Sequence, residues 1–116
     1  MSDCVFCKIV AGDIPSTKVY EDDHVLGFKD LSPQAPTHYL FIPKKHYTSF
    51  ADVPLNEMNV MAQIFSALKT VAEKEGLTKR GFRTTMNTLK EGGQSVFHMH
   101  VHLMAKKQMG ADMTGA

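Results

Sequence analysis

One seven-residue segment restricts the possible folds of this chain more than any other. From His98 to Met104 the sequence reads His-Met-His-Val-His-Leu-Met, so histidine alternates with an apolar residue until the last position. A strict period of two is typical of a β-strand with one buried face, because successive side chains in a strand point to opposite sides. The segment therefore predicts a strand that presents three imidazoles on one face and directs Met99, Val101 and Leu103 into the core.

Three roles are open for these histidines. They can form the polar face of a half-buried strand, which is the common role of an isolated histidine. Two imidazoles at His-x-His spacing can instead bind one Zn²⁺ ion, and a third protein ligand would complete a catalytic metal site. A neutral imidazole, with a pKa of about 6.5, is also a competent nucleophile at cellular pH. Alternation of three histidines disfavours the first role, because it places all three imidazoles along one groove.

Hydrophobic periodicity predicts two helices. Apolar residues at helical spacing, followed by Gly12, predict a short helix over residues 4–11. Apolar residues within 58–72 form one face at a period of about 3.6, and they include Phe65. They predict a long amphipathic helix that begins near residues 52–54 and ends at Gly76.

Runs rich in β-branched and aromatic residues predict five strands. These strands are expected over residues 18–21, 25–29, 38–42, 82–87 and 96–104. They follow one another closely except where the long helix separates the third from the fourth. The predicted fold class is therefore α+β, with a largely antiparallel sheet covered on one face.

Length and charge limit the classes of function. A chain of 116 residues is long enough for one domain, so residues 1–116 are predicted to form a single domain. Thirteen Lys plus Arg against twelve Asp plus Glu leave a net charge of +1, so we expect no nucleic-acid partner. No apolar stretch approaches the ~20 residues that span a bilayer, and the start lacks a secretion signal, so we expect a cytoplasmic protein without a membrane partner.

The two cysteines are separated by two residues. Cys4 and Cys7 are badly spaced for a structural disulfide but well spaced for a metal or redox pair. Two small hydrophobic side chains on a short helix are a further alternative. Alone, the pair would supply at most two metal ligands.

The histidine segment resembles the His-φ-His-φ-His-φ-φ motif of the histidine triad family, where φ is an apolar residue, and the match covers all seven positions. The resemblance extends over most of the chain and indicates the Hint branch of that family. The segments that carry it are residues 4–9, 30–38, 42–46, 87 and 92–96. The resemblance implies a HIT-like fold.

The resemblance also implies catalytic roles for three residues. His100, the middle histidine, would be the nucleophile and form a covalent nucleotidyl intermediate. His102 would bind a phosphate oxygen, and Ser95 would assist where the leaving amine gains a proton. His38 corresponds to a strand histidine beneath the site.

Further residues match the family's nucleotide-binding positions. Asp30 corresponds to the acid that binds the ribose hydroxyls, and Asn87 to a polar residue near ribose and phosphate. The glycine-containing segment before the triad would approach the phosphate closely and present free N–H groups. The residues of this segment assigned to the nucleotide site are Gly93, Gln94, Ser95 and Val96, and the base pocket would comprise Val5, Phe6, Ile9, Phe28 and Leu31.

A structural zinc site is implied in the same way. Members that carry the N-terminal cysteine pair commonly complete it with two histidines, which gives Cys4, Cys7, His46 and His98 here. Four protein ligands close the site to substrate, so this Zn²⁺ would stabilise the fold and take no part in catalysis.

The expected function is hydrolysis of purine nucleoside 5′-phosphoramidates. Cleavage of the P–N bond would release an amine and a nucleoside monophosphate such as AMP or GMP, and family members are homodimers. A zinc-dependent hydrolase that uses the triad as ligands is a less favoured alternative. A nucleotide-binding regulatory module with slow catalysis is another, because the same pocket would serve it.

Overall fold

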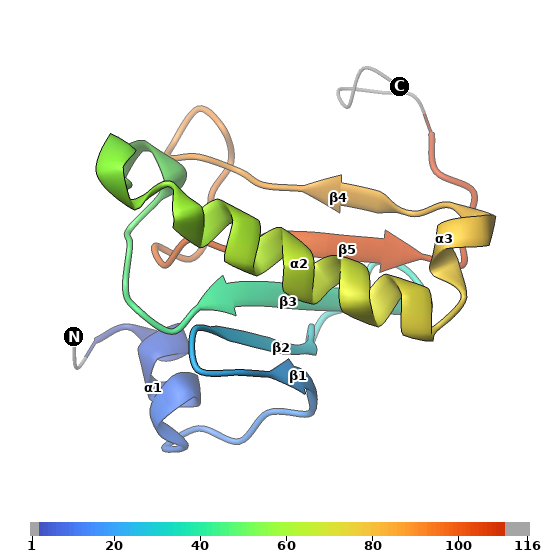
Figure 1. Cartoon of the computed structure of the whole chain (residues 1–116), viewed down its shortest axis with the longest axis horizontal. Helices are drawn as coiled ribbons and strands as arrows, with labels where there is room; N and C mark the ends of the chain where they lie inside the picture. Colours follow the sequence, from blue (N-terminus) through green and yellow to red (C-terminus); the bar gives the residue numbers. More distant parts are fainter. Residues whose placement is uncertain (1–2, 111–116) are drawn as a thin grey trace.

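Five strands form one sheet in the order β1-β2-β3-β5-β4, and every neighbouring pair is antiparallel (Figure 1). The computed structural model describes residues 3–110, so both ends of the predicted domain, 1–116, lie outside the described residues. The strands are β1 (Lys18–Glu21), β2 (Val25–Lys29), β3 (Thr37–Pro43), β4 (Arg83–Thr85) and β5 (Val101–Ala105). The predicted α+β fold with an antiparallel five-stranded sheet is confirmed.

Three α-helices accompany the sheet. Helix α1 (Val5–Ala11) begins after Cys4, whose side chain caps it, and ends at Gly12 with a φ of 85°. A left-handed conformation of this kind favours glycine, as expected for a helix C-cap. The long helix α2 (Asn59–Lys74) is followed at once by the short helix α3 (Leu77–Arg80), which the sequence did not predict.

The beginning of α2 differs from the prediction. Residues 52–54 do not open the helix, because two short 3-10 helices, Phe50–Asp52 and Leu55–Glu57, lie before it. Pro54 separates the two in an extended conformation. Since proline cannot donate a backbone hydrogen bond and fixes its own φ, the chain forms single turns here before the regular helix begins.

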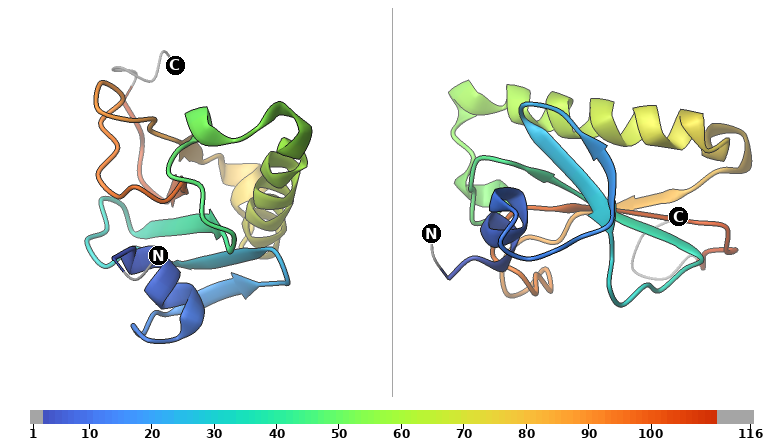
Figure 2. Two further views of the ribbon diagram at one scale, coloured as in Figure 1. Left: turned by 90° about the vertical axis from the view of Figure 1, so that its left-hand side faces the viewer. Right: turned by 90° about the horizontal axis from the view of Figure 1, so that it is seen from below.

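Helix α2 covers one face of the sheet (Figure 2). Its buried residues Ile64, Leu68 and Ala72 pack against alternate side chains of the central strands, such as Phe41 and Val101. We call this layer the α2-side core. Phe65, predicted to share that face, is instead 40% exposed, because it lies at the edge of the helical stripe.

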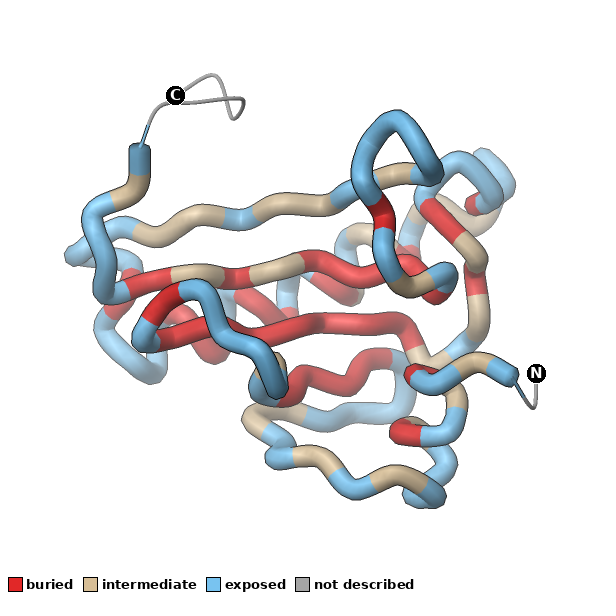
Figure 3. The backbone as a smooth tube through the Cα atoms, turned by 180° about the vertical axis from the view of Figure 1, so that it is seen from behind, coloured by how far each residue is buried: buried red, intermediate tan, exposed pale blue. Residues whose placement is uncertain are grey.

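Helix α1 packs on the other face of the sheet, where a smaller cluster forms the α1-side core (Figure 2). Strand β3 supplies both layers, since its residues alternate between them and all seven are buried (Figure 3). The α1-side core consists of Phe6, Ile9, Leu26, Phe28, Leu40 and Ile42. The face left free by α2 is therefore only partly covered.

Strand β5 is shorter than the predicted strand 96–104. Pairing with β3 stops at Val101, and beyond it the backbone N–H of Met99 donates to the carbonyl oxygen of Tyr47. The alternation of the side chains nevertheless persists, because Met99, Val101 and Leu103 all lie in the α2-side core. The three triad histidines consequently face the α1 side, although His98 is completely buried and does not line an open groove.

Strand β4 is also shorter than its predicted range, 82–87, and covers three residues at the edge of the sheet. Among residues 3–110, no helix combines the length and apolar character needed to cross a membrane.

Candidate active site and metal site

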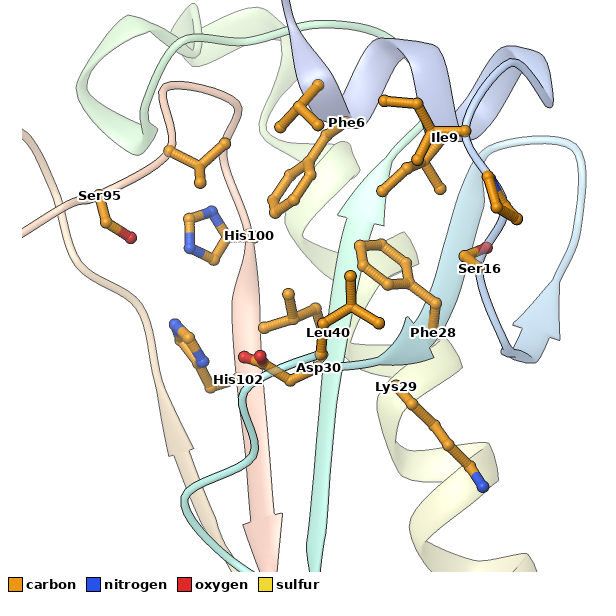
Figure 4. A pocket seen from close by; sticks show the side chains of 15 residues that line it. Phe6, Ile9, Ser16, Phe28, Lys29, Asp30, Leu40, Ser95, His100 and His102 are labelled. Atoms are coloured by element: carbon orange, nitrogen blue, oxygen red, sulfur yellow. The ribbon is translucent and has the colours of Figure 1, made fainter.

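A cavity of about 240 Å³ opens on the α1 side of the sheet. Figure 4 shows its two halves: Phe6, Ile9 and Phe28 gather on one side, while Ser95, His100 and His102 gather on the other. Asp30 lies between them, at the end of β2. Such a cavity suits a ligand with a flat apolar part joined to a polar, anionic part.

His100 is held in one tautomer by its own backbone. Its Nδ1 lies 2.8 Å from the carbonyl oxygen of His98. Since a carbonyl oxygen only accepts, Nδ1 must carry the proton and Nε2 must carry a free lone pair. Burial lowers the pKa of His100, which favours the neutral ring. The residue predicted as nucleophile therefore lies in the cavity with an unprotonated nitrogen.

The tautomer of His102 follows from a chain of hydrogen bonds. The backbone N–H of Gln34 donates to Nδ1 of His38 at 3.0 Å, so the proton of this buried ring is on Nε2. That Nε2 lies 2.9 Å from Nδ1 of His102 and donates to it. His102 must then carry its own proton on Nε2, as a donor. Burial, aided by the nearby His100 and His38, lowers the pKa of His102 to about 4.

Asp30 joins this chain from the side of the cavity. Its Oδ2 lies 3.4 Å from Nε2 of His38, and its Oδ1 accepts from the backbone N–H of Ser32 at 2.8 Å. The carboxylate is held by the loop that follows β2, yet it still lines the cavity. It can accept hydrogen bonds from hydroxyl groups of a bound ligand.

Phe6 links helix α1 to His100. Its ring meets that of Phe28 edge-on at 5.5 Å and that of His100 at 5.3 Å between centroids. Phe6 and Ile9 are buried, whereas the other predicted base-pocket residues Val5 and Leu31 are 39% and 86% exposed at the cavity mouth. The position of α1 thus sets the shape of the apolar half.

The loop before the triad is shaped by contacts within itself. A Cβ atom on Gly92 would lie 2.4 Å from the carbonyl oxygen of Thr88, and Gly93 has a φ of 78°. The buried Gln94 side chain accepts from the N–H of Leu89 and donates to the carbonyl oxygens of Thr48 and Val96. These contacts leave Ser95 exposed at the cavity.

Not every residue predicted for the nucleotide site lines the cavity. Asn87, Gly93 and Gln94 are absent from its wall, whereas the other ten predicted residues are present. Five further residues line it that the sequence did not indicate, namely Ile14, Pro15, Ser16, Lys29 and Leu40. Only Leu40 had a usable signal, because its strand alternation places it on the face that carries His38.

A second cluster brings together the four residues predicted to bind zinc. The sulfur of Cys4 lies 3.3 Å from Nδ1 of His98, and that of Cys7 lies 3.4 Å from Nδ1 of His46. The two Nδ1 atoms are 3.2 Å apart, and all four ligand atoms lie within 4.8 Å of one another. A tetrahedral Zn²⁺ with normal bond lengths needs N···N edges of about 3.3 Å and S···N edges of about 3.5 Å. The donor set and its spacing therefore fit zinc.

The surroundings of this cluster also suit a metal. Nε2 of His98 lies 2.8 Å from the carbonyl oxygen of Pro43, so the proton is on Nε2 and Nδ1 is free to bind. The N–H of Cys7 donates to the sulfur of Cys4 at 3.2 Å, which stabilises a thiolate. Burial raises the pKa of Cys7 to about 11, so its thiol would lose a proton only when a cation binds.

The chain is similar over almost its whole length to a known protein domain. Residues 11–109 match the HIT (histidine triad) domain. The chain belongs to the HIT family. A histidine triad protein of Clostridium difficile has a solved structure that superposes on this HIT protein with a TM-score of 0.93 and 48% identity, covering 95% of this chain and 96% of that one.

Two relatives bear on its chemistry. The purine nucleoside phosphoramidase of Escherichia coli K12 is 41% identical over 106 residues, which is 91% of this HIT protein and 89% of the relative. The 14 kDa zinc-binding protein of Brassica juncea is 43% identical over 109 residues, 92% and 96% of the two chains. The predicted family and the predicted enzyme class, a hydrolase, are confirmed.

Proposed function

We propose that this HIT protein hydrolyses purine nucleoside 5′-phosphoramidates and releases an amine and AMP or GMP. The observation that carries the proposal is the tautomer of His100, whose free Nε2 lone pair lies in a cavity that also holds a carboxylate and an apolar cleft. The similarity of this chain to a purine nucleoside phosphoramidase supports the same substrate class.

The two halves of the cavity suit the two ends of such a substrate. The apolar half between Phe6, Ile9 and Phe28 would hold a purine by stacking and shape. Asp30 would accept hydrogen bonds from the ribose hydroxyls. His102 and Ser95 would then donate to the phosphate oxygens, because the proton of His102 is on Nε2 and a hydroxyl can always donate. Asn87, Gly93 and Gln94 would support this arrangement through the shape of their loop.

The reaction would proceed in two steps. First, Nε2 of His100 attacks phosphorus, the bond from phosphorus to the leaving nitrogen breaks, and its electron pair stays on that nitrogen. A proton from solvent passes to the nitrogen by way of the Ser95 hydroxyl, so a neutral amine departs. Second, water attacks phosphorus and loses one proton to solvent, the bond to His100 breaks with its electron pair returning to Nε2, and the nucleoside monophosphate leaves. The net reaction consumes one water and regenerates the neutral imidazole.

In our proposal Zn²⁺ has a structural role. Cys4, Cys7, His46 and His98 would hold it, and four protein ligands leave no position for substrate. Bound there, the metal would tie α1 to the sheet and so keep Phe6 against His100.

The protein would act as a cytoplasmic homodimer, for which the exposed Phe65 of α2 offers an apolar contact.

The test is turnover of adenosine 5′-phosphoramidate by the wild-type protein and the His100→Ala variant. Loss of the nucleophile should lower kcat by about 10³-fold or more. The exposed His24 lies on the β1–β2 turn, outside the cavity, so His24→Ala should leave the rate unchanged. Equal rates for wild type and His100→Ala would refute the proposal, and a trapped nucleotide on His100 would support it directly.

A further inference from the structure

An exposed aromatic residue lies beside the reactive histidines without a role in the fold. In the predicted strand 96–104, Phe97 would share a face with Met99 and enter the core. Bends at residues 96–98 turn it outward instead, and it is 52% exposed, while Met99 is buried. A phenyl ring in this position contacts water next to the cavity.

Phe97 borders a broad surface groove that continues from the cavity. The groove is lined by Asp3, Cys4, Val5, His46, Ser95, Val96 and Phe97. Val5, Ser95 and Val96 line the groove and the cavity alike, so the two spaces meet along these side chains. Ser95 stands at the junction, on the histidine side of the cavity (Figure 4).

The continuity determines which part of a substrate can reach the groove. With the purine in the apolar half and phosphorus at His100, the substituent on phosphorus beyond Ser95 is the leaving amine. We propose that the groove binds this leaving group, and that Phe97 and Asp3 make the enzyme prefer amines with an alkyl chain that ends in a positive charge. This inference rests on the proposed function and adds the class of amine to it.

The character of the lining supports this class. Val5 and Phe97 are partly exposed and would contact a hydrocarbon chain. Asp3 is exposed and is the single acidic residue among the seven that line the groove, and no lysine or arginine is among them. Cys4 and His46 belong to the metal cluster, so they add no free cation. A cationic chain end would thus meet a carboxylate, and an anionic one would be repelled.

Three substrates that share the AMP part can test the groove. They are the unsubstituted phosphoramidate, its N-hexyl derivative, and an N-aminohexyl derivative with a terminal amine. Wild type should favour hexyl over the unsubstituted compound by about tenfold in kcat/KM. It should favour aminohexyl over hexyl by about threefold at low salt, as for an exposed ion pair.

Two variants should alter these ratios separately. Phe97→Ala should lower the hexyl preference to about a fifth of its wild-type value or less. Asp3→Asn should abolish the aminohexyl preference and leave the hexyl preference intact. The amines differ in intrinsic reactivity, and this difference cancels when the same ratio is compared between wild type and variant. Phe50→Ala, an exposed phenylalanine of the 3-10 helix Phe50–Asp52 that lines neither the cavity nor the groove, is the control and should change neither ratio.

The same three compounds, bound to the His100→Ala protein in calorimetry, separate this inference from the proposed function. Suppose that the wild type hydrolyses none of the compounds, but that the ratios of their affinities depend on Phe97 and Asp3. The leaving-group site is then supported and the proposed reaction is refuted. If turnover occurs but neither variant changes its ratio, or if Phe97→Ala lowers all three rates equally, the leaving-group site is overturned.

Discussion

Nε2 of His38 lies 2.9 Å from Nδ1 of His102, and this contact fixes the proton of His102 on the nitrogen that can face a substrate. The direction of these hydrogen bonds is set by the backbone. The N–H of Gln34 can only donate, so Nδ1 of His38 must accept and its proton lies on Nε2. A loop amide thus determines the protonation pattern of a predicted catalytic residue two side chains away.

Replacement of His38 should therefore act through His102. His38→Leu removes the donor and should lower kcat by about 10- to 100-fold with little change in KM, as for a lost supporting hydrogen bond. His38→Gln can place an amide N–H near the lost Nε2 and should recover most of the rate. The ¹⁵N resonances of the His102 ring should show a mixture of tautomers in His38→Leu and mainly the Nε2–H form in His38→Gln.

The thermal unfolding of both variants provides the control, since His38 is buried. If both unfold at the wild-type temperature and lose activity equally, while the His102 tautomer is unchanged, then His38 acts only by packing and the relay is wrong.

Acid should destabilise the protein through His102. Burial lowers the pKa of this residue in the folded state to about 4, below its ordinary value of 6.5. Between these two values the unfolded chain binds more protons than the folded one, so the free energy of unfolding falls as the pH drops from about 6.5 and levels off below about 4. Denaturant unfolding at a series of pH values measures this slope.

His102→Gln should make that part of the pH dependence less steep, while the buried His100, whose pKa is also lowered, keeps part of the slope. The variant cannot titrate there, so its free energy of unfolding should differ from that of the wild type by an amount that shrinks toward low pH. A constant difference across this range would show that His102 titrates normally in the folded protein.

Loss of zinc should release α1. Removal of the metal by a chelator, or Cys7→Ser, should lower the melting temperature by about 10 °C or more, because four ligands from distant segments lose their common partner. Below that temperature, kcat should stay within about tenfold of wild type, whereas KM should rise since Phe6 no longer holds the apolar half in place.

Metal analysis gives the corresponding check. Wild type should contain one zinc per chain and Cys7→Ser far less, while His24→Ala, a histidine change outside the cluster, should retain it. Full zinc content in Cys7→Ser, or complete loss of kcat on chelation of a folded protein, would contradict a purely structural site.

Gly92 should tolerate no side chain. The Cβ of Gly92→Ala would lie 2.4 Å from the carbonyl oxygen and 2.7 Å from the backbone nitrogen of Thr88, so the loop that carries Ser95 must shift. We expect a loss of about 1–3 kcal/mol in stability together with a lower kcat. Gly110→Ala, whose Cβ would have no neighbour within 4 Å, should cost less than about 0.5 kcal/mol. Equal effects of the two changes would contradict this account.

The fold was predictable where a local pattern repeats over many residues. The period of α2 and the alternation of β5 each rest on several side chains, so burial selects one arrangement. The ends of these elements were less predictable. Strand β5 begins only at Val101, because the backbone N–H of Met99 donates to Tyr47, 52 positions away in the chain, and no local pattern predicts that contact.

The site was predictable mainly through resemblance. Ten of the predicted nucleotide-site residues line the cavity, but Gln94 uses its side chain to hold its own loop, which a motif does not reveal. Ser16, in the segment between α1 and β1, and Lys29, the last residue of β2, line the cavity together although they lie 13 positions apart in the chain. Pocket walls of this kind depend on how elements pack, and periodicity within one element carries no such information.

Side-chain alternation along one extended segment was set by the sequence alone: it assigns Met99, Val101 and Leu103 to one layer and the three histidines to the other. Tertiary structure decided what each histidine does. His98 lies against two cysteines and His46, His100 donates to the carbonyl oxygen of His98, and His102 accepts a hydrogen bond from His38. The physical reason is that a neutral imidazole has two accessible tautomers, and the folded backbone and neighbouring side chains select one of them by supplying a donor or an acceptor.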